Sequence, residues 1–326
     1  MNASGLTAMS KTPAVTRRVR AYFAPVDRVL GIPTIFDPAA AGRFDLDNPP
    51  DPWTDLGWIE HFTRKSGSQA GTLMAGAPAT VQMQVKDNVS ATVSFRFVTW
   101  NKLTMALAAG SQHMNLLSPV GGTAAIGSGG KATPAVGLTA GSTAKLLAMS
   151  ATDSATFAAG QIVAVDGDYS GQIGHVGKPV SAAYVRSADD VANDPDYVRR
   201  VTFNLARVAQ VTSTGLTLTD ALPAGLPDPG MKVQVVVGFV DREGGRFFQE
   251  WSALFVMEGE QGERLLFHYP RLQSMEGAQE TSVPMVSPLN REMLDACFRA
   301  LPVSDGNDGE QVLCYRTFLP VSVYQG

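Results

Sequence analysis

The sequence predicts an all-β protein with one short helix, and three observations lead to this prediction. Charge is sparse at 17% Asp, Glu, Lys and Arg, and 32 Gly and 20 Pro residues favour strands joined by turns. Apolar and polar residues alternate in many short runs. In the longest run, residues 80–97, the alternation has period two, and a helical pattern follows directly at 101–110. With 326 residues, 44% of them hydrophobic, the chain can bury a sizeable core.

The first expected strands are residues 17–24 (RRVRAYFA) and 56–63 (LGWIEHFT). Residues 80–97 carry apolar side chains at odd positions, which predicts one face on a core and one face in water. This apolar row consists of Val81, Met83, Val85, Val89, Ala91, Val93, Phe95 and Phe97. Lys86-Asp87-Asn88 interrupts the row and indicates either a bulge or a turn between two strands.

A short helix is expected after this run. Asn101 can cap its start, Leu103, Ala106 and Leu107 form its apolar side, and Gly110 is placed to end it.

Two long loops are expected between the early strands. Residues 36–55 contain four prolines and five aspartates, which exclude a regular central strand or helix. Residues 64–78 are polar and rich in Gly and Ala. Trp53 lies in the first loop, where it is either packed or an exposed anchor for a neighbouring subunit. Trp100 and Trp251 lie in or beside alternating strands, which predicts core positions for both.

The pattern changes between about residues 113 and 228. A stretch rich in Gly, Ala, Ser and Pro, residues 116–138, indicates a linker or an extended crossing. Short alternating pieces then predict a small β-barrel or sandwich of five or six strands. These pieces are residues 144–149, 161–166, 197–204, 207–212 and 216–218. The predicted domains are a flexible arm (1–16), a discontinuous sandwich domain (17–115 and 233–326) and an inserted β-domain (116–232).

Alternation resumes at residues 233–239, and 241–245 (DREGG) predicts a hairpin turn into the strand FFQEWSALFVM. A strand at 264–269 is expected to end at Pro270, with a polar loop at 274–288. Residues 289–301 fit both a helical stripe and a strand. A turn at 305–310 and the β-rich residues 311–318 favour a strand in a hairpin with that segment.

The two cysteines, Cys297 and Cys314, fit reduced thiols. The alternative is a cross-strand disulfide, which requires Asp305-Gly306 to form the two-residue turn of that hairpin.

The residue types of common catalytic and cofactor sites do not occur at the required spacings. The four histidines are scattered, the sequence has no nucleophile-elbow motif, and 127–131 lacks the residues of a phosphate-binding loop. We therefore expect no enzyme activity, no cofactor and no strong metal site. The weak metal candidate is a calcium loop of Asp166, Asp168 and Ser170. Residue 177, however, is Gly where a bidentate acid is needed, and a plain β-turn is the alternative.

The net charge of −4, with no basic block, argues against a protein that grips nucleic acid by its phosphates. It fits a wall past which DNA slides, because acidic side chains repel phosphate. We find no apolar run of signal-peptide or membrane-span length, so production in the cytoplasm is expected.

Three segments together resemble the tail tube (major tail) proteins of tailed bacteriophages. They are DLGWIEHFTR at 55–64, TVSFRF at 92–97 and WNKLTMALAAG at 100–110. The resemblance is one of pattern and covers about residues 15–112 and 236–322. It implies a β-sandwich with one short flanking helix that assembles into stacked hexameric rings, and long loops that reach from one ring to the next.

The resemblance also implies partners and interface residues. The partners are further copies of the chain, the tape measure, tail terminator and baseplate proteins, and DNA that passes through the lumen without specific binding. Candidate interface residues are Phe44, Asp47 and Trp53 in the first loop, and Arg64 and Lys65 in the second. Alternative functions are a distal tail or baseplate hub ring, and a carbohydrate-binding adhesin that stacks exposed aromatic side chains on sugars.

Overall fold

The computed structural model describes residues 16–26, 32–38, 44–47, 49–50, 52–120, 132–167, 197–243, 250–259, 262–275, 279–285 and 290–319. Strands predominate in this part of the chain, and all their pairings are antiparallel. The described helices are three short ones, α1 (Lys102–Ala109), α2 (Ala151–Ser154) and α3 (Tyr197–Val201). The predicted all-β fold is confirmed.

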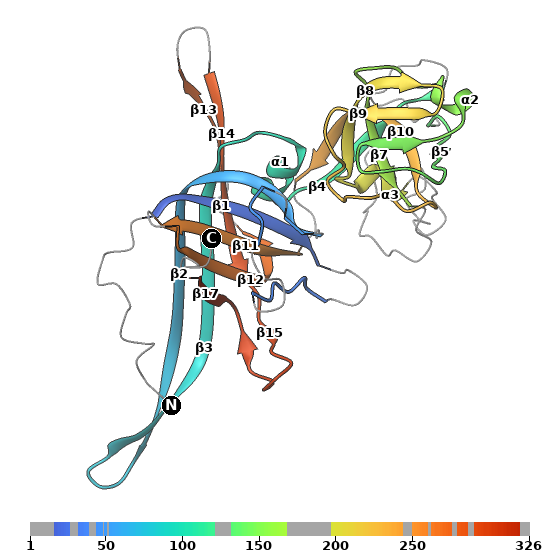
Figure 1. Ribbon diagram of the computed structural model, residues 1–326. Coiled ribbons are helices and arrows are strands. Elements are labelled where there is room, and N and C mark those ends of the chain that lie inside the picture. The colour runs from blue at the N-terminus through green and yellow to red at the C-terminus, as the bar shows by residue number, and fades with distance from the viewer. Residues whose placement is uncertain are drawn as a thin grey trace.

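The larger sheet closes into a barrel (Figure 1). Its described strands are β1 (Thr16–Pro25), β2 (Thr54–Ala75), β3 (Thr80–Phe97), β11 (Glu250–Gly259), β12 (Arg264–Ser274), β13 (Gln279–Pro284), β14 (Asn290–Ala300) and β17 (Tyr315–Leu319). They follow the order β13-β14-β3-β2-β1-β11-β12-β17, and β14 also pairs with β12. This extra pairing joins β3, β2, β1, β11, β12 and β14 into one closed circuit.

A second sheet is formed by strands that come between β3 and β11 in the sequence. Its described strands are β4 (Gln112–Leu117), β5 (Val136–Gly137), β6 (Leu146–Ala148), β7 (Ile162–Asp166), β8 (Leu205–Thr212), β9 (Gly215–Leu218) and β10 (Lys232–Arg242). The order is β4-β10-β7-β8-β9-β6, with β5 beside β10. Figure 1 shows this sheet to one side of the barrel, connected to it through β4 and β10. A two-stranded pair, β15 (Val303–Ser304) and β16 (Gln311–Val312), completes the described strands.

The barrel interior is filled by aromatic side chains from most of its strands. Phe23, Phe255 and Phe298 are fully buried, and Phe95 is 2% exposed. The Phe95 and Phe298 rings stack with centroids 5.7 Å apart, and Phe23 lies 5.5 Å from Phe298. Aromatic pairs at these separations add specific ring contacts to the burial of apolar area. The alternation of residues 91–97 thus places its odd positions in the core, as predicted.

The helix predicted at 101–110 is confirmed, with Asn101 as its N-cap and Gly110 as its C-cap. Asn101 accepts a hydrogen bond from the Thr104 amide, and the Thr104 hydroxyl accepts one from the Asn101 amide. Gly110 ends α1 in the left-handed conformation at φ 62°, where a Cβ would also meet Ser274. Leu107 of the helix packs into the barrel core.

The Pro- and Asp-rich segment covers the outer face of the barrel. Phe36, Phe44, Leu46 and Trp53, together here called the strap, are at most 8% exposed. They pack against outward-facing side chains of three strands, namely Tyr22 and Ala24 of β1, Leu254 and Val256 of β11, and Leu266 of β12. The described residues of this segment before β2 form no strand, and its described apolar residues are part of the folded chain.

The loop expected at 64–78 is wrong, because β2 continues to Ala75. It pairs with β3 from Ile59 opposite Phe97 to Ala75 opposite Thr80. Asp87 is skipped in this register, since Gln69 pairs with Asn88 and Ala70 with Lys86. Of the two alternatives for residues 86–88, a bulge within one strand is therefore the observed one.

Several predicted pairings in the last third of the chain are wrong. β10 pairs with β4, β5 and β7 in the second sheet, whereas β11 pairs with β1 and β12, so the described residues on either side of 241–245 do not pair as the expected hairpin. The sequence prediction had placed residues 233–239 in the sandwich domain. β12 continues through Pro270 to Ser274, and part of the expected polar loop at 274–288 is strand β13.

Residues 290–300 form a strand, as favoured, but not the expected hairpin. β14 pairs with β13, β3 and β12, and the strand that includes Tyr315 pairs with β12. Cys297 lies opposite Ser94, and both cysteines are free thiols. The disulfide alternative is therefore wrong.

In the second sheet, the strands expected at 144–149, 161–166, 207–212 and 216–218 correspond to β6, β7, β8 and β9. The strand expected at 197–204 is wrong, because residues 197–201 form α3. The expected N-terminal arm lies, except for Thr16, outside the described residues. The outer limits of the predicted domains stay a prediction.

Truncating Phe298 tests whether the closed barrel is the main source of stability. We expect Phe298→Ala to lower the free energy of unfolding by about 3–5 kcal/mol, because a fully buried ring leaves a cavity among Phe23 and Phe95. The matched control is Phe318→Ala on β17, where the ring is 53% exposed and the change should be within about 0.5 kcal/mol. Urea unfolding measures both, and equal losses would contradict this account of the core.

Candidate interaction surface

The β2–β3 hairpin projects beyond the barrel, at the end opposite to the β13–β14 hairpin (Figure 1). β2 pairs with β1 only up to Ile59, and β3 pairs with β14 only from Thr92 onward. Between Lys65 and Ser90 every described side chain of the hairpin is exposed. The two strands satisfy each other's backbone groups on one side, and within the described residues their other edges have no strand neighbour.

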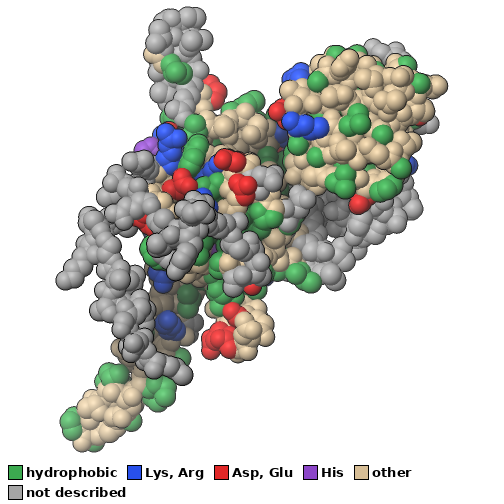
Figure 2. Space-filling model, in the orientation of Figure 1, with side chains coloured by type: hydrophobic (Ala, Val, Ile, Leu, Met, Phe, Trp, Pro, Cys, Tyr) green, Lys and Arg blue, Asp and Glu red, His purple; other side chains and the backbone are tan. Residues whose placement is uncertain are grey.

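Large apolar side chains lie on this projecting part. Leu73 is 59% exposed, Met83 and Val85 are 55% exposed, and Met74 and Val81 exceed 50%. Figure 2 shows hydrophobic side chains gathered at the far end of the hairpin. The prediction that the whole apolar row from Val81 to Phe97 faces a core is thus wrong for its first half. A soluble monomer seldom exposes so many adjacent apolar side chains, which marks this surface for a partner.

The bulge at Asp87 moves the apolar row to the other face of the hairpin. Near the barrel, Ser66 lies opposite Ala91, on the face that continues into the core. Farther out, Gly71 lies opposite Val85 and Leu73 opposite Met83. Residues that pair directly share a face, and successive residues of β2 alternate between faces. Gly71 and Leu73 of β2, with Val85 and Met83, therefore lie on the face opposite to the core side.

The base of the hairpin is held by polar contacts to the barrel. Arg64 donates through Nε to the Tyr269 hydroxyl at 3.0 Å, and its guanidinium lies 5.0 Å from the Phe267 ring centroid. Arg96 of β3 forms two hydrogen bonds, of 2.7 and 3.0 Å, to the Asp295 carboxylate of β14. These contacts fix the direction in which the hairpin leaves the barrel.

The five interface residues expected from the sequence fall into three groups. Trp53 and Phe44 are 5% and 2% exposed in the strap, so of the two alternatives for Trp53, packed or an exposed anchor, the packed one is observed. Arg64 is half-buried at the hairpin base. Asp47 and Lys65 are exposed, although Asp47 accepts a hydrogen bond from Arg20 at 2.8 Å. Only the last two remain accessible to a neighbour.

The other tryptophans are divided between core and surface. Trp251 is 8% exposed and belongs to the barrel core, which confirms its prediction. Trp100 is 52% exposed directly before α1, and its predicted core position is wrong. The alternation that suggested it ends at Phe97, three residues earlier.

The weak calcium candidate is only partly described. Asp166 ends β7, where its carboxylate accepts a hydrogen bond from the Gly167 amide at 2.8 Å, and burial raises its pKa. Asp168 and Ser170 lie outside the described residues. Among the described residues there is no group of three His, Cys, Asp or Glu side chains that could hold a metal ion.

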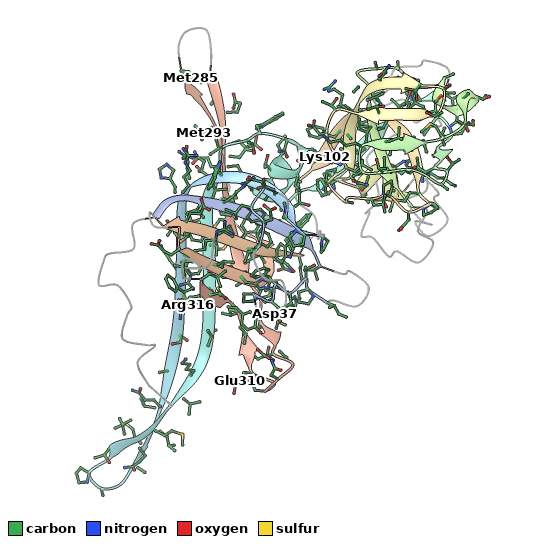
Figure 3. The ribbon with its side chains drawn as sticks, viewed as in Figure 1. Asp37, Lys102, Met285, Met293, Glu310 and Arg316 are labelled. Carbon is green, nitrogen blue, oxygen red and sulfur yellow. The ribbon has the colours of Figure 1, made fainter. Side chains whose placement is uncertain are left out.

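Lys102 lies where the barrel meets the second sheet (Figure 3). Its Nζ donates to Asn115 Oδ1 at 2.6 Å and to the Thr202 carbonyl at 2.9 Å, and it lies 4.7 Å from the Phe203 ring centroid. Phe203 also meets the Trp251 ring of β11 at 5.8 Å. Burial lowers the pKa of Lys102 to about 7, because the charged form is poorly solvated there.

Comparison of the sequence with models of protein families and with curated proteins gives no match. In the part of the chain that the structure describes, no helix has the length and apolar character needed to span a membrane.

Replacing Lys102 tests the buried amine at this junction. Its pKa is about 7 in the folded chain and about 10.5 when exposed, so unfolding takes up a proton between these values. The free energy of unfolding of the wild type should therefore rise with pH from 7 towards 10, by up to about 1.4 kcal/mol per pH unit. Lys102→Met should lack this rise, whereas the exposed control Lys86→Met should keep it. Urea unfolding at pH 7, 8 and 9 measures the slopes, and parallel slopes for all three proteins would refute the assignment.

Proposed function

We propose that this chain is a structural protein of the bacteriophage virion, which assembles with further copies of itself into the stacked rings of a tail tube. The observation that supports this most is the projecting β2–β3 hairpin. Its two strands pair with each other as far as Ala75 opposite Thr80, yet Leu73, Met83 and Val85 are more than half exposed. Burying one such side chain contributes about 1.5–3 kcal/mol, so a neighbour that covers the hairpin gains appreciable binding energy.

A second copy of the chain is the partner that we favour. β13 and β17 end the described order of the larger sheet, and each presents backbone groups along a free edge. One copy thus offers both a long hairpin and open strand edges at different places on its surface. Contacts between unlike surfaces of identical copies close into rings when the rotation permits, and stacked rings make a tube.

In this proposal the hairpin takes over the role that the sequence gave to the two loops. It reaches from one ring to the next, while the second sheet decorates the outside of the tube, where added bulk leaves the lumen free. DNA passes through the lumen without specific binding, in keeping with a net charge of −4. The protein is made in the host cytoplasm and resides in the virion. The tape measure, tail terminator and baseplate proteins are its further partners.

Two other functions rest on particular features. A distal tail or baseplate hub ring would use the same hairpin and edges, and its copy number in a particle would be that of a single ring rather than of a whole tube. A carbohydrate-binding adhesin is favoured by Trp100 and Phe318, which are 52% and 53% exposed. Binding to a glycan array that is lost in Trp100→Ala would support the adhesin.

The triple variant Leu73→Ser, Met83→Ser, Val85→Ser tests the proposed function. It should abolish rings and tubes in negative-stain electron microscopy across a concentration series in which the wild type forms them. Its melting temperature should change by less than about 3 °C, because these side chains are already exposed in the monomer. The matched control is Thr72→Ser, Gln84→Ser, a directly paired and exposed couple on the other face of the hairpin. This control should assemble like the wild type.

Two results would count against the proposal. Assembly of the triple variant at wild-type concentration would exclude the apolar face as the contact. Single small particles of the wild type at every concentration, even when tail initiation proteins are added, would exclude self-assembly itself.

A further inference from the structure

His268 is a buried histidine that no catalytic or metal site explains. It lies on β12 and is 2% exposed. Within the described residues, neither of its ring nitrogens has a hydrogen-bond partner. A buried polar group without a partner is unfavourable by about 1–3 kcal/mol, and a charged one by more. Adding a proton to such a group would therefore destabilise the packing around it.

The strap is one of the covers over this imidazole. The Trp53 ring meets the His268 ring edge-on, with centroids 5.7 Å apart. On the β17 side, the Tyr315 ring lies 6.0 Å away, and its hydroxyl donates to the Asp305 carboxylate at 2.8 Å. On the β11 side, His268 lies opposite Leu254, which is apolar. Asp305 is the acid nearest to the ring in these contacts, and it is occupied by Tyr315.

Hydrogen bonds from β1 and β12 also hold the strap. The Tyr22 hydroxyl donates to the Leu46 carbonyl at 2.9 Å, and Arg264 donates to the Phe44 carbonyl at 2.9 Å. Asp47, exposed beside Leu46, pairs with Arg20 and is another titratable group in this segment. The first two bonds do not change with acid, whereas the Asp47–Arg20 pair can, so the experiment must separate the effect of His268 from that of Asp47.

We propose that the Trp53–His268 contact is an acid-released latch, in which a proton on His268 frees the strap while the barrel stays folded. An imidazolium between Trp53 and Tyr315 has no acceptor and must reach water. The barrel strands hold each other by hydrogen-bonded pairs on both sides, whereas the strap has no strand pairing. The strap therefore yields first and uncovers Tyr22, Leu254 and Leu266. This inference goes beyond the proposed function and does not depend on it.

The size of the pH effect on strap opening follows from the pKa of the His268 ring when it is buried and when it is exposed. Burial lowers the pKa of His268 to about 4, against about 6.5 when the ring is exposed. The open state therefore binds the proton more tightly. The equilibrium constant for opening of the strap, here called the opening constant, grows as the pH falls between these values. From pH 7 to pH 4.5 the strap should open roughly 60-fold more often.

The opening constant can be measured by the rate at which a thiol in the strap is labelled. The thiol is introduced by Leu46→Cys, and Cys297→Ser and Cys314→Ser remove the native thiols. The labelling rate is divided by that of the urea-unfolded chain at the same pH, which cancels the reactivity of the thiol itself. We expect a rise of roughly 60-fold from pH 7 to pH 4.5. The global unfolding constant, from urea titrations at each pH, should stay smaller than the opening constant.

Added substitutions in this background identify the titrating group. His268→Phe, which keeps an aromatic ring without a charge, should change less than about threefold over the same pH range. Asp47→Asn and the exposed control His61→Asn should both keep the rise. An equal rise in His268→Phe, no rise in the parent chain, or loss of the rise in Asp47→Asn would each overturn the proposal.

A second measurement covers the case in which His268→Phe does not fold. NMR can follow the protonation of the His268 ring in the wild type, because only four histidines contribute ring signals that must be told apart. Protonation should coincide with the rise in thiol labelling of the Leu46→Cys chain. A ring that protonates while this thiol stays protected would overturn the latch.

Discussion

The structure depends on one strand, β14, which pairs with β3 on one side and with β12 on the other. This double pairing turns an open sheet into a barrel and gives it an inside. The inward side chains of β1, β3, β11 and β14 then form a single aromatic core around Phe23, Phe95 and Phe298. The outer face of the barrel also carries apolar side chains on β1, β11 and β12, which would be exposed to water without a further segment packed on them. The strap provides that cover with Phe36, Phe44, Leu46 and Trp53.

Closure also explains why the β2–β3 hairpin is available. Only β2 up to Ile59 and β3 from Thr92 pair with the neighbouring barrel strands. The rest of both strands projects as a paired hairpin. Since the strap keeps its aromatic residues for its own chain, the apolar surface offered to others lies on the hairpin instead. The bulge at Asp87 decides which face carries it. The exposed apolar face of the hairpin and the core thus come from the same alternating stretch, divided by one extra residue.

Local signals in the sequence were enough for much of the fold. Asn101 and Gly110 determine their own helix ends, and alternation identified residues 91–97. The strand at 290–300 was favoured only through an expected hairpin with 311–318, which is not the observed pairing. Alternation does not say what covers the apolar face, so Val81, Met83 and Val85 looked like core residues. It also suggested a strand at 197–204, where the chain forms a short helix.

Pairing between strands far apart in the sequence could not be predicted from such local signals. β10 and β11 follow each other in the sequence but lie in different sheets, and β4, β7 and β1, with which they pair, are more than 60 residues away. The sequence left open whether Trp53 is packed or exposed, and the outer face of β1, β11 and β12 buries it. For the same reason, the exposed apolar side chains lie on the hairpin and not on the Pro- and Asp-rich segment. Which apolar side chain finds a cover depends on strands distant in the sequence.

The most direct test of this account is electron cryo-microscopy of the assembled wild-type protein, at a resolution that shows side chains. The account predicts that Leu73, Met83 and Val85 of each copy are buried against another copy, with the β2–β3 pairing unchanged. It also predicts that the closed barrel persists within each subunit. Assemblies in which the hairpins project into solvent, or in which the contacts between copies lie wholly elsewhere, would contradict it.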